Sequence, residues 1–288
     1  MNHSVTQPIL MLVWVGLLSS SFVVSGKLLP YASPITATCL RFILTSLCLA
    51  PLIWRSGIAR LTAKQVVQYT LISSFLVAFF VGLFESLKTT SAEKTAVIYT
   101  LLPLMSVILS FVFIGIKTRI SQLFGFLIGT ASAIWMLVNG QKDLMILSAW
   151  QYGDSIFLIA CFCLAMHVLL IKKWATALPA LISTFYIVTL GSVLLVPVML
   201  LYGDLTNLVW QSYTFWTWLI YLTLFTTLGT FFLQQHLLKQ VSPNTFLAMT
   251  YLVPAFVLFF QGGLFQFLLS IPALLVASFA LYLISRAP

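Results

Sequence analysis

Apolar runs of membrane-spanning length occupy most of this 288-residue chain. A transmembrane α-helix needs about 20 apolar residues, and its backbone polar groups must be hydrogen-bonded inside the bilayer. Ten runs approach that length, and short breaks rich in Gly, Pro, Asn and charged residues separate them: 8–26, 34–54, 66–87, 94–115, 121–139, 152–171, 178–202, 213–236, 243–262 and 266–285. We therefore expect an all-α integral membrane protein with ten transmembrane helices.

The composition excludes a water-soluble globular domain. Hydrophobic residues make up 61% of the chain, charged residues make up 7%, and the mean hydropathy is +1.10, whereas soluble domains carry about 25% charged residues. The net charge of +9 does not indicate a nucleic-acid partner, because the basic residues are spread over separate segments and form no single patch. The expected partner of the surface is the lipid bilayer, whose headgroups attract basic loops.

The ionisable residues fall into two groups when successive breaks are assigned to alternate sides of a membrane. One side receives nine of the fourteen basic residues and no acidic residue: Arg55, Arg60, Lys64, Lys117, Arg119, Lys172, Lys173, Lys239 and Arg286. The other side receives all five acidic residues and four basic ones: Glu85, Glu93, Asp143, Asp154, Asp204, Lys27, Lys88, Lys94 and Lys142. Because short loops rich in Lys and Arg remain cytoplasmic, the pattern predicts cytoplasmic N- and C-termini and supports ten spans.

The chain also contains an internal repeat. Residues 87–103 align without a gap with residues 238–254, and five positions are identical: Leu87 with Leu238, Lys88 with Lys239, Ser91 with Ser242, Leu101 with Leu252 and Pro103 with Pro254. Each copy lies between the third and fourth span of a five-span half, and because five is odd the second half must be inverted. We place the two inverted repeats at residues 1–142 and 143–288. Such repeats are typical of secondary transporters, whose site lies between the halves near the bilayer midplane.

Several short motifs lie in a characteristic order along these runs. They are Ser20-Ser21-Phe22, Ser33-Pro34, Arg41-Phe42 and Gly153-Asp154, together with the repeated element of Leu87-Lys88, Ser91 and Pro103 and of Leu238-Lys239, Ser242 and Pro254. In their order and spacing, the chain resembles the EamA family of the drug/metabolite transporter superfamily over nearly its whole length. The resemblance implies two inverted bundles that surround a central cavity.

The resemblance also implies a function. Members of the family export or exchange small metabolites, amino acids among them, without nucleotide hydrolysis. The sequence agrees on this point, since it contains no phosphate-binding G-x-x-x-x-G-K-[ST] motif. We therefore expect a multi-pass transporter of a bacterial inner membrane that works by alternating access on a small-molecule substrate, with no cofactor, no metal and no catalytic residue.

Arg41 and Glu85 are the ionisable residues expected to matter for gating or coupling. Arg41 follows Pro34 by seven residues, which places it ~10 Å below the outer boundary of its helix. A charge at that depth is costly unless it is paired or faces a wet cavity. Arg41 could bind a substrate carboxylate or act in gating, or it could reach outward or pair with Glu85. Glu85 could carry a coupling proton, form part of an outer gate or lie at the interface as a surface charge.

Pro103 and Pro254 occupy equivalent places in the two halves, inside the expected fourth and ninth helices. Proline removes a backbone hydrogen bond and kinks a helix, so we expect a pair of hinges that let each half rock. Hydroxylated side chains within one turn of these prolines suit small amphipathic ligands, and the strongest candidates to line a cavity are Tyr99, Thr100, Thr250 and Tyr251. Weaker cavity candidates in other helices are Ser20, Ser21, His167, Tyr186 and Gln234.

His167 has two further interpretations. It could bind substrate or carry a proton, although a neutral imidazole bonded across helices is the commoner arrangement. Cys163 shares a helix face with His167, but Cys161 points nearly the opposite way and no fourth ligand is nearby in the sequence. The sequence therefore does not predict a metal site.

Other functions remain open from the sequence. Within transport, a multidrug exporter is the first alternative, and an acidic residue in the cavity would favour cationic drugs. An intramembrane enzyme would need catalytic groups clustered at one depth, whereas the ionisable residues here are few and dispersed. A non-transporting sensor or assembly subunit is a third alternative. The sequence also leaves open whether protons or the substrate gradient supply the energy, and what the oligomeric state is.

Overall fold

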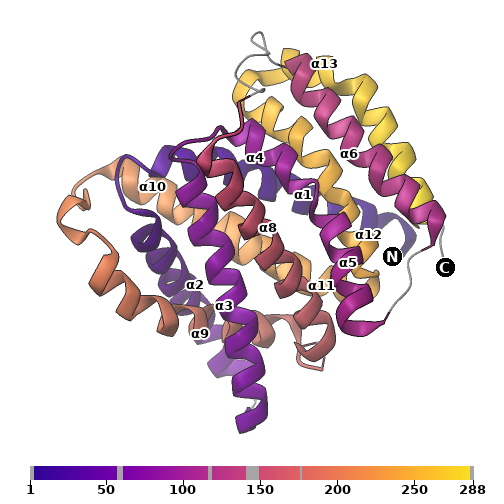
Figure 1. Ribbon diagram of the computed structural model, residues 1–288. Coiled ribbons are helices and arrows are strands. Elements are labelled where there is room, and N and C mark those ends of the chain that lie inside the picture. Colours follow the sequence, from indigo (N-terminus) through magenta and orange to yellow (C-terminus); the bar gives the residue numbers. More distant parts are fainter. Residues whose placement is uncertain (1–2, 57–60, 116–118, 141–148, 176, 286–288) are drawn as a thin grey trace.

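The computed structural model describes residues 3–56, 61–115, 119–140, 149–175 and 177–285. Within these residues all regular secondary structure is helical, and the helices pack into one bundle (Figure 1). Eight helical segments are long and apolar enough to cross a membrane: Gln7–Leu28, Pro34–Arg55, Ala63–Ser86, Ala92–Phe113, Tyr152–Ala175, Ala180–Tyr202, Tyr213–Gln240 and Thr245–Ile284. The expectation of an all-α protein with membrane-spanning helices is confirmed.

The helices of the first half are α1 (His3–Leu28), α2 (Pro34–Ser56), α3 (Ala63–Ser86), α4 (Ala92–Tyr99), α5 (Leu102–Ile114) and α6 (Ile120–Gly140). Those of the second half are α8 (Tyr152–Leu170), α9 (Ala180–Tyr202), α10 (Tyr213–Tyr221), α11 (Thr230–Gln240), α12 (Pro243–Ala248) and α13 (Val253–Ser285). Between them lie two π-helical segments, η1 (Ile171–Ala175) and η3 (Leu222–Gly229), and two 3-10 segments, η2 (Leu205–Asn207) and η4 (Met249–Leu252).

The ten apolar runs are distributed over the eight long segments and one shorter helix. The fifth run forms α6, whose apolar part Ile120–Met136 is shorter than the other spans. The ninth and tenth runs lie in one continuous segment that ends with α13, and Gly263 interrupts this helix with φ 71° and ψ −163°. Glycine adopts a positive φ without a steric penalty, so the chain can bend there between the two arms of α13.

The contacts between helices follow the pattern of a pseudo-two-fold axis that relates the two halves. α4 contacts α13 while α5 contacts α12, so these two kinked spans run antiparallel to each other. α2 packs on its counterpart α9, and α6 packs on α13, as Figure 1 shows at the edge of the bundle. The contact of α3 with α8 has its equivalent in the contacts of α1 with η3 and α11. An antiparallel pairing of equivalent elements is the arrangement expected for inverted repeats.

The repeated segment has the same local structure in both halves. Ser91 caps α4 by accepting a hydrogen bond from the Lys94 N–H at 3.2 Å, and Ser242 caps α12 by accepting one from the Thr245 N–H at 3.2 Å. A serine at this position satisfies one of the free N–H groups at the start of a helix. The identical serines of the repeat therefore begin equivalent helices, which explains one of the five identities.

The two repeated prolines follow a break in each span. Pro103 is the second residue of α5, after a turn at Thr100 and Leu101, and Pro254 is the second residue of α13, after the 3-10 segment η4. A proline ring clashes with the carbonyl four residues earlier and donates no backbone hydrogen bond. The α-helical ladder is therefore interrupted in the turn that precedes each proline, at equivalent points of the two halves.

Candidate functional site

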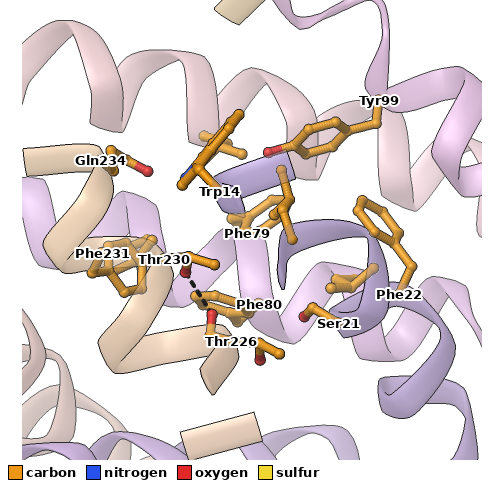
Figure 2. A pocket seen from close by; sticks show the side chains of 14 residues that line it. Trp14, Ser21, Phe22, Phe79, Phe80, Tyr99, Thr226, Thr230, Phe231 and Gln234 are labelled. Atoms are coloured by element: carbon orange, nitrogen blue, oxygen red, sulfur yellow. Dashed lines mark hydrogen bonds between the residues drawn. The ribbon is translucent and has the colours of Figure 1, made fainter. Parts of the chain in front are cut away.

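A central cavity lies at the interface between the two halves (Figure 2). The first half contributes residues of α1, α3 and α4: Trp14, Leu18, Ser21, Phe22, Leu76, Phe79, Phe80, Leu83 and Tyr99. The second half contributes residues of α8, η3 and α11: Leu164, Thr226, Thr230, Phe231 and Gln234. The volume open to the centre of a water-sized sphere is ≈ 20 Å³, which is room for about one water molecule. The cavity is therefore nearly closed in this conformation.

Helical periodicity explains why these side chains meet. Counted from the first lining position of each helix, the other lining positions follow at three, four, seven or eight residues, so they form one stripe on α1 and one on α3. Several of the lining side chains are aromatic, and the Phe22 ring lies 5.1 Å from the Tyr99 ring and nearly perpendicular to it. Edge-to-face contacts of this kind stabilise closely packed aromatic clusters. The wall of the cavity is thus mainly apolar and aromatic.

Three of the residues proposed from the sequence lie on this wall. Ser21 comes from α1, Tyr99 from the end of α4 and Gln234 from α11, and Figure 2 shows them converging from different helices. The Gln234 Nε2 atom is buried and has no hydrogen-bond partner among the described residues. A ligand in the cavity would therefore find polar groups from both halves.

Other sequence candidates are engaged in contacts outside the lining. The Ser20 hydroxyl donates to the Leu17 carbonyl at 2.7 Å and accepts from the Tyr221 hydroxyl at 2.9 Å. Thr100 and Thr250 are buried, and each donates its hydroxyl at 2.6 Å to the carbonyl three residues earlier. These hydroxyls satisfy backbone carbonyls at the breaks before the two prolines, as threonine often does within helices.

Tyr251 packs against helix α6. Its hydroxyl donates to the Phe126 carbonyl at 2.9 Å, and its ring fills the place that a Cβ would take at Gly129. The Gly125 and Gly129 positions of α6 thereby allow the close approach of α13 and of the Tyr251 ring.

His167 and Tyr186 also lie away from the cavity wall. The His167 Nδ1 atom is 3.0 Å from the Ile72 carbonyl oxygen, which joins α8 to α3, and its ring faces Phe231 at 6.0 Å. Tyr186 lies on α9, 6.0 Å from the ring of Tyr69. The described placement of His167 is that of an imidazole bonded across helices.

Arg41 is fully buried, with none of its surface exposed, so it does not reach outward. It donates hydrogen bonds from Nε to the Thr227 hydroxyl and from Nη2 to the Thr226 hydroxyl, the latter at 2.8 Å. Its Cζ atom lies 4.3 Å above the centre of the Phe80 ring, within the range of a cation–π contact. The pairing with Glu85 that the sequence allowed is not formed.

The π-helical segment η3 explains why two successive threonines meet Arg41. Both Thr226 and Thr227 donate their hydroxyl hydrogens to the Leu222 carbonyl, at 3.0 and 2.8 Å. The wider turn of a π-helix brings a carbonyl within reach of the fifth residue along the chain. Since both hydrogens are used in this way, both hydroxyl oxygens can accept from the guanidinium.

Glu85 forms a surface ion pair within its own turn. Its carboxylate lies 2.8 Å from the Lys88 ammonium, and the two side chains are 41% and 46% exposed. Pairs of this kind contribute little to stability because water screens them. Glu85 therefore lies at the rim and takes no part in the lining of the cavity.

A second ion pair, which the sequence did not predict, connects the two halves. The Lys94 Nζ atom of α4 donates to the Asp154 carboxylate of α8 at 2.5 Å and to the Ala149 carbonyl at 2.7 Å. Asp154 also accepts from the Thr90 hydroxyl at 2.6 Å and from the Gln151 N–H at 2.8 Å. We call these five residues the Lys94–Asp154 cluster. Its signal in the sequence is an acid three residues after the N-cap residue Gln151, a position from which the carboxylate can accept from the N-cap N–H.

The residues that the sequence reasoning missed are mostly apolar. Trp14 is not among the residues expected to line a cavity, yet it is only 2% exposed and lies on the cavity wall. A stripe of aromatic residues on a transmembrane helix predicts burial in general, and it does not distinguish a cavity from packed core. The spacing of Thr226, Thr230 and Gln234 was the available signal, since one polar residue per helical turn marks a polar face.

A model of the EamA-like transporter family matches the chain twice, over residues 7–138 and 151–284. A solved structure described only as "Crystal structure of protein" shares the fold, with a TM-score of 0.74 and 14% sequence identity, and the match covers 98% of this chain and 98% of that chain. None of the curated proteins compared matches the sequence. The two family matches cover most of the chain, one in each half, and the chain therefore belongs to the EamA-like transporter family.

Proposed function

We propose that this protein is a secondary transporter that exports or exchanges small metabolites, with amino acids as the first substrates to test, in a bacterial inner membrane. The observation that carries the proposal is the central cavity, because its wall is built by both repeats. Transporters made of inverted repeats bind their substrate between the halves. The multidrug alternative gains no support from the cavity, since none of its lining side chains is acidic.

We further propose ten spans with both termini on the cytoplasmic side. Residues near both chain ends, Gln7 and Pro8 of α1 and Leu281 and Tyr282 of α13, line one surface pocket, which supports termini on the same side. At the same end, the Gln7 side-chain amide donates a hydrogen bond to the Gln240 side-chain carbonyl at 3.0 Å. Gln240 follows Lys239, which the charge pattern predicts on the cytoplasmic side. The proposed boundary between the repeats, at residues 142 and 143, lies outside the described residues.

The proposed mechanism is a rocking of one half against the other. The nearly closed cavity corresponds to an occluded conformation, and the Lys94–Asp154 cluster joins the halves at the proposed outer end. Opening to the outside would separate α4 from α8 and break this ion pair. The helix interruptions before Pro103 and Pro254 are the proposed hinges, because a broken hydrogen-bond ladder bends with little further cost. In this mechanism the substrate gradient supplies the energy for transport. Coupling to protons is tested separately, by assays with and without a pH gradient.

Counterflow exchange in proteoliposomes tests this function. The purified protein is reconstituted, loaded with a mixed pool of amino acids and other small metabolites, and assayed for tracer uptake with and without a pH gradient. We expect accelerated exchange of one chemical class. Ser21→Phe, which places a ring in the cavity, should reduce exchange at least tenfold, whereas Cys48→Phe on the exposed face of α2 should not.

Two results would contradict the proposal. The first is a folded protein that exchanges no member of the pool faster than empty liposomes. The second is exchange that is equally sensitive to Ser21→Phe and Cys48→Phe, because transport would then not pass through the cavity. An exchange rate that depends on the pH gradient would identify protons as the coupling ion.

A further inference from the structure

The positive charge of Arg41 has no acidic counterpart in the described part of the bundle. The ion pairs found there join Lys88 to Glu85 and Lys94 to Asp154. Arg41 has instead two threonine hydroxyls and the face of Phe80. Its third nitrogen, Nη1, is enclosed and has no hydrogen-bond partner among the described residues. A buried guanidinium is thus left without a counter-ion and with one donor group unused.

The guanidinium lies directly behind the wall of the central cavity. Two of its contacts, Thr226 and Phe80, are themselves lining residues. Figure 2 shows Thr226 and Ser21 at the same end of the cavity, away from Gln234. A shift of the Phe80 ring or of the Thr226 side chain would therefore expose the charge of Arg41 to a ligand in the cavity.

An unpaired charge in the membrane interior is costly, and such residues are retained where they meet a substrate, an ion or a partner charge. The planar guanidinium matches the geometry of a carboxylate, which can accept two parallel N–H bonds. The polar groups of the wall are neutral hydroxyls and the Gln234 amide, its other side chains are apolar, and none of its side chains is acidic. One buried positive charge therefore lies beside a small, mainly apolar cavity.

We propose that the cavity binds a small monocarboxylate with a flat apolar body, and that its carboxylate is the counter-ion of Arg41. This inference rests on the proposed transport function and narrows its substrate class from metabolites in general to organic anions. The carboxylate lies at the Thr226 end, where it meets Arg41, and the apolar body lies between the rings of Phe22, Phe79 and Tyr99. Binding widens the cavity, because the closed form has room for about one water molecule.

The test uses three probes that share a ring and differ only in charge: benzoate, benzamide and benzylamine. The full-length protein in detergent is titrated with each probe at constant ionic strength, and the thermal midpoint of unfolding is followed. A ligand that binds only the folded state raises this midpoint. We expect benzoate to reach half-saturation at a concentration at least about tenfold lower than benzamide, because a hydrogen bond between two charged groups adds to the affinity. Benzylamine should not raise the midpoint of unfolding.

Variants of Arg41 place the effect at the proposed site. Arg41→Gln should abolish the preference for benzoate over benzamide, and Arg41→Lys should retain part of it because the charge is kept. Lys88→Gln removes an equally charged side chain at the exposed surface pair and should leave the preference unchanged. If Arg41→Gln does not fold, the comparison of the three probes on the wild type and on Arg41→Lys still decides the matter.

The outcomes separate this inference from the proposed function. Equal stabilisation by benzoate and benzamide, or a benzoate preference that survives in Arg41→Gln, overturns the anion site even if counterflow succeeds. A benzoate preference that depends on Arg41, together with a failure of all exchange, supports the anion site and overturns transport. Benzoate exchange that depends on Arg41 supports both.

Discussion

Arg41 and Lys94 are both buried cations, yet their surroundings differ. Lys94 joins α4 to α8 and donates to the Asp154 carboxylate and to the Ala149 carbonyl, so its charge is compensated. Asp154 accepts two further hydrogen bonds, from Thr90 and Gln151. Arg41 has no carboxylate in the described bundle and keeps one nitrogen unbonded. A compensated buried pair holds elements together, while an uncompensated charge costs stability and can be relieved by a ligand.

The difference shows that burial and charge alone do not identify a functional residue. Asp154 is completely buried and has the more elaborate network, but that network is already complete and offers nothing to a ligand. Arg41 has fewer contacts and lies next to the cavity. Lys94 and Asp154 connect the two halves, and Arg41 is the residue for which we propose a role in recognition.

The largest effect is expected from breaking the compensated pair. Asp154→Asn leaves the Lys94 ammonium buried without its counter-charge, which should lower the free energy of unfolding by about 3–5 kcal/mol. Thermal unfolding in detergent measures this loss. The double variant Lys94→Met with Asp154→Leu removes both charges and should recover most of the stability. If the single variant proves as stable as the wild type, the pair does not hold the halves together.

A smaller effect should follow when the Lys94–Asp154 cluster is displaced without a change in charge. A Cβ at Gly153 would lie 2.5 Å from both the Ser86 carbonyl oxygen and the Thr89 hydroxyl, so α8 would have to move away from α3. Gly153→Ala should cost about 1–3 kcal/mol, the range for overpacking. Gly26→Ala is the matched control, since no atom lies within 4 Å of its Cβ position. Equal stability of the two variants would contradict the close approach of these helices.

Removal of the uncompensated charge should have the opposite sign. Arg41→Met replaces the charged side chain by an unbranched apolar one and so removes the cost of burying an unpaired charge. The free energy of unfolding should therefore be unchanged or should rise by about 1 kcal/mol. The same variant should lose the stabilisation by benzoate. A destabilisation as large as that of Asp154→Asn would show that Arg41 is mainly structural and would weaken its assignment to recognition.

The smallest effect is expected at the exposed pair. Glu85→Gln disrupts an ion pair whose side chains are 41% and 46% exposed, and it should change the free energy of unfolding by less than about 0.5 kcal/mol. If protons drive transport through Glu85, the same variant should abolish the dependence of exchange on a pH gradient. Unaltered pH dependence in Glu85→Gln would remove Glu85 from the coupling pathway.

Much of the fold could be predicted from local patterns. Run length and the repeat of residues 87–103 in 238–254 indicated membrane-spanning helices and equivalent halves, because both depend on spacing along the chain. The repeat also placed the two prolines at equivalent points of the halves, although the helix breaks lie in the turn before each proline. The helix caps at Ser91 and Ser242 were not predicted. The lining of the cavity was predicted only in part, because Ser21, Tyr99 and Gln234 cannot be distinguished by sequence from Ser20, Thr100 and Tyr251.

The sequence by itself determined the all-helical membrane architecture, the two related halves and the family, since hydropathy and repeated motifs are properties of the chain read in order. Only the tertiary structure decided that Arg41 meets Thr226 and Thr227 and not Glu85, and that Lys94 meets Asp154. The partner of a buried charge is chosen by helix rotation and by the π-helical turn of η3, and these depend on packing between distant segments. The electrostatic character of the site therefore emerges only when the halves are assembled.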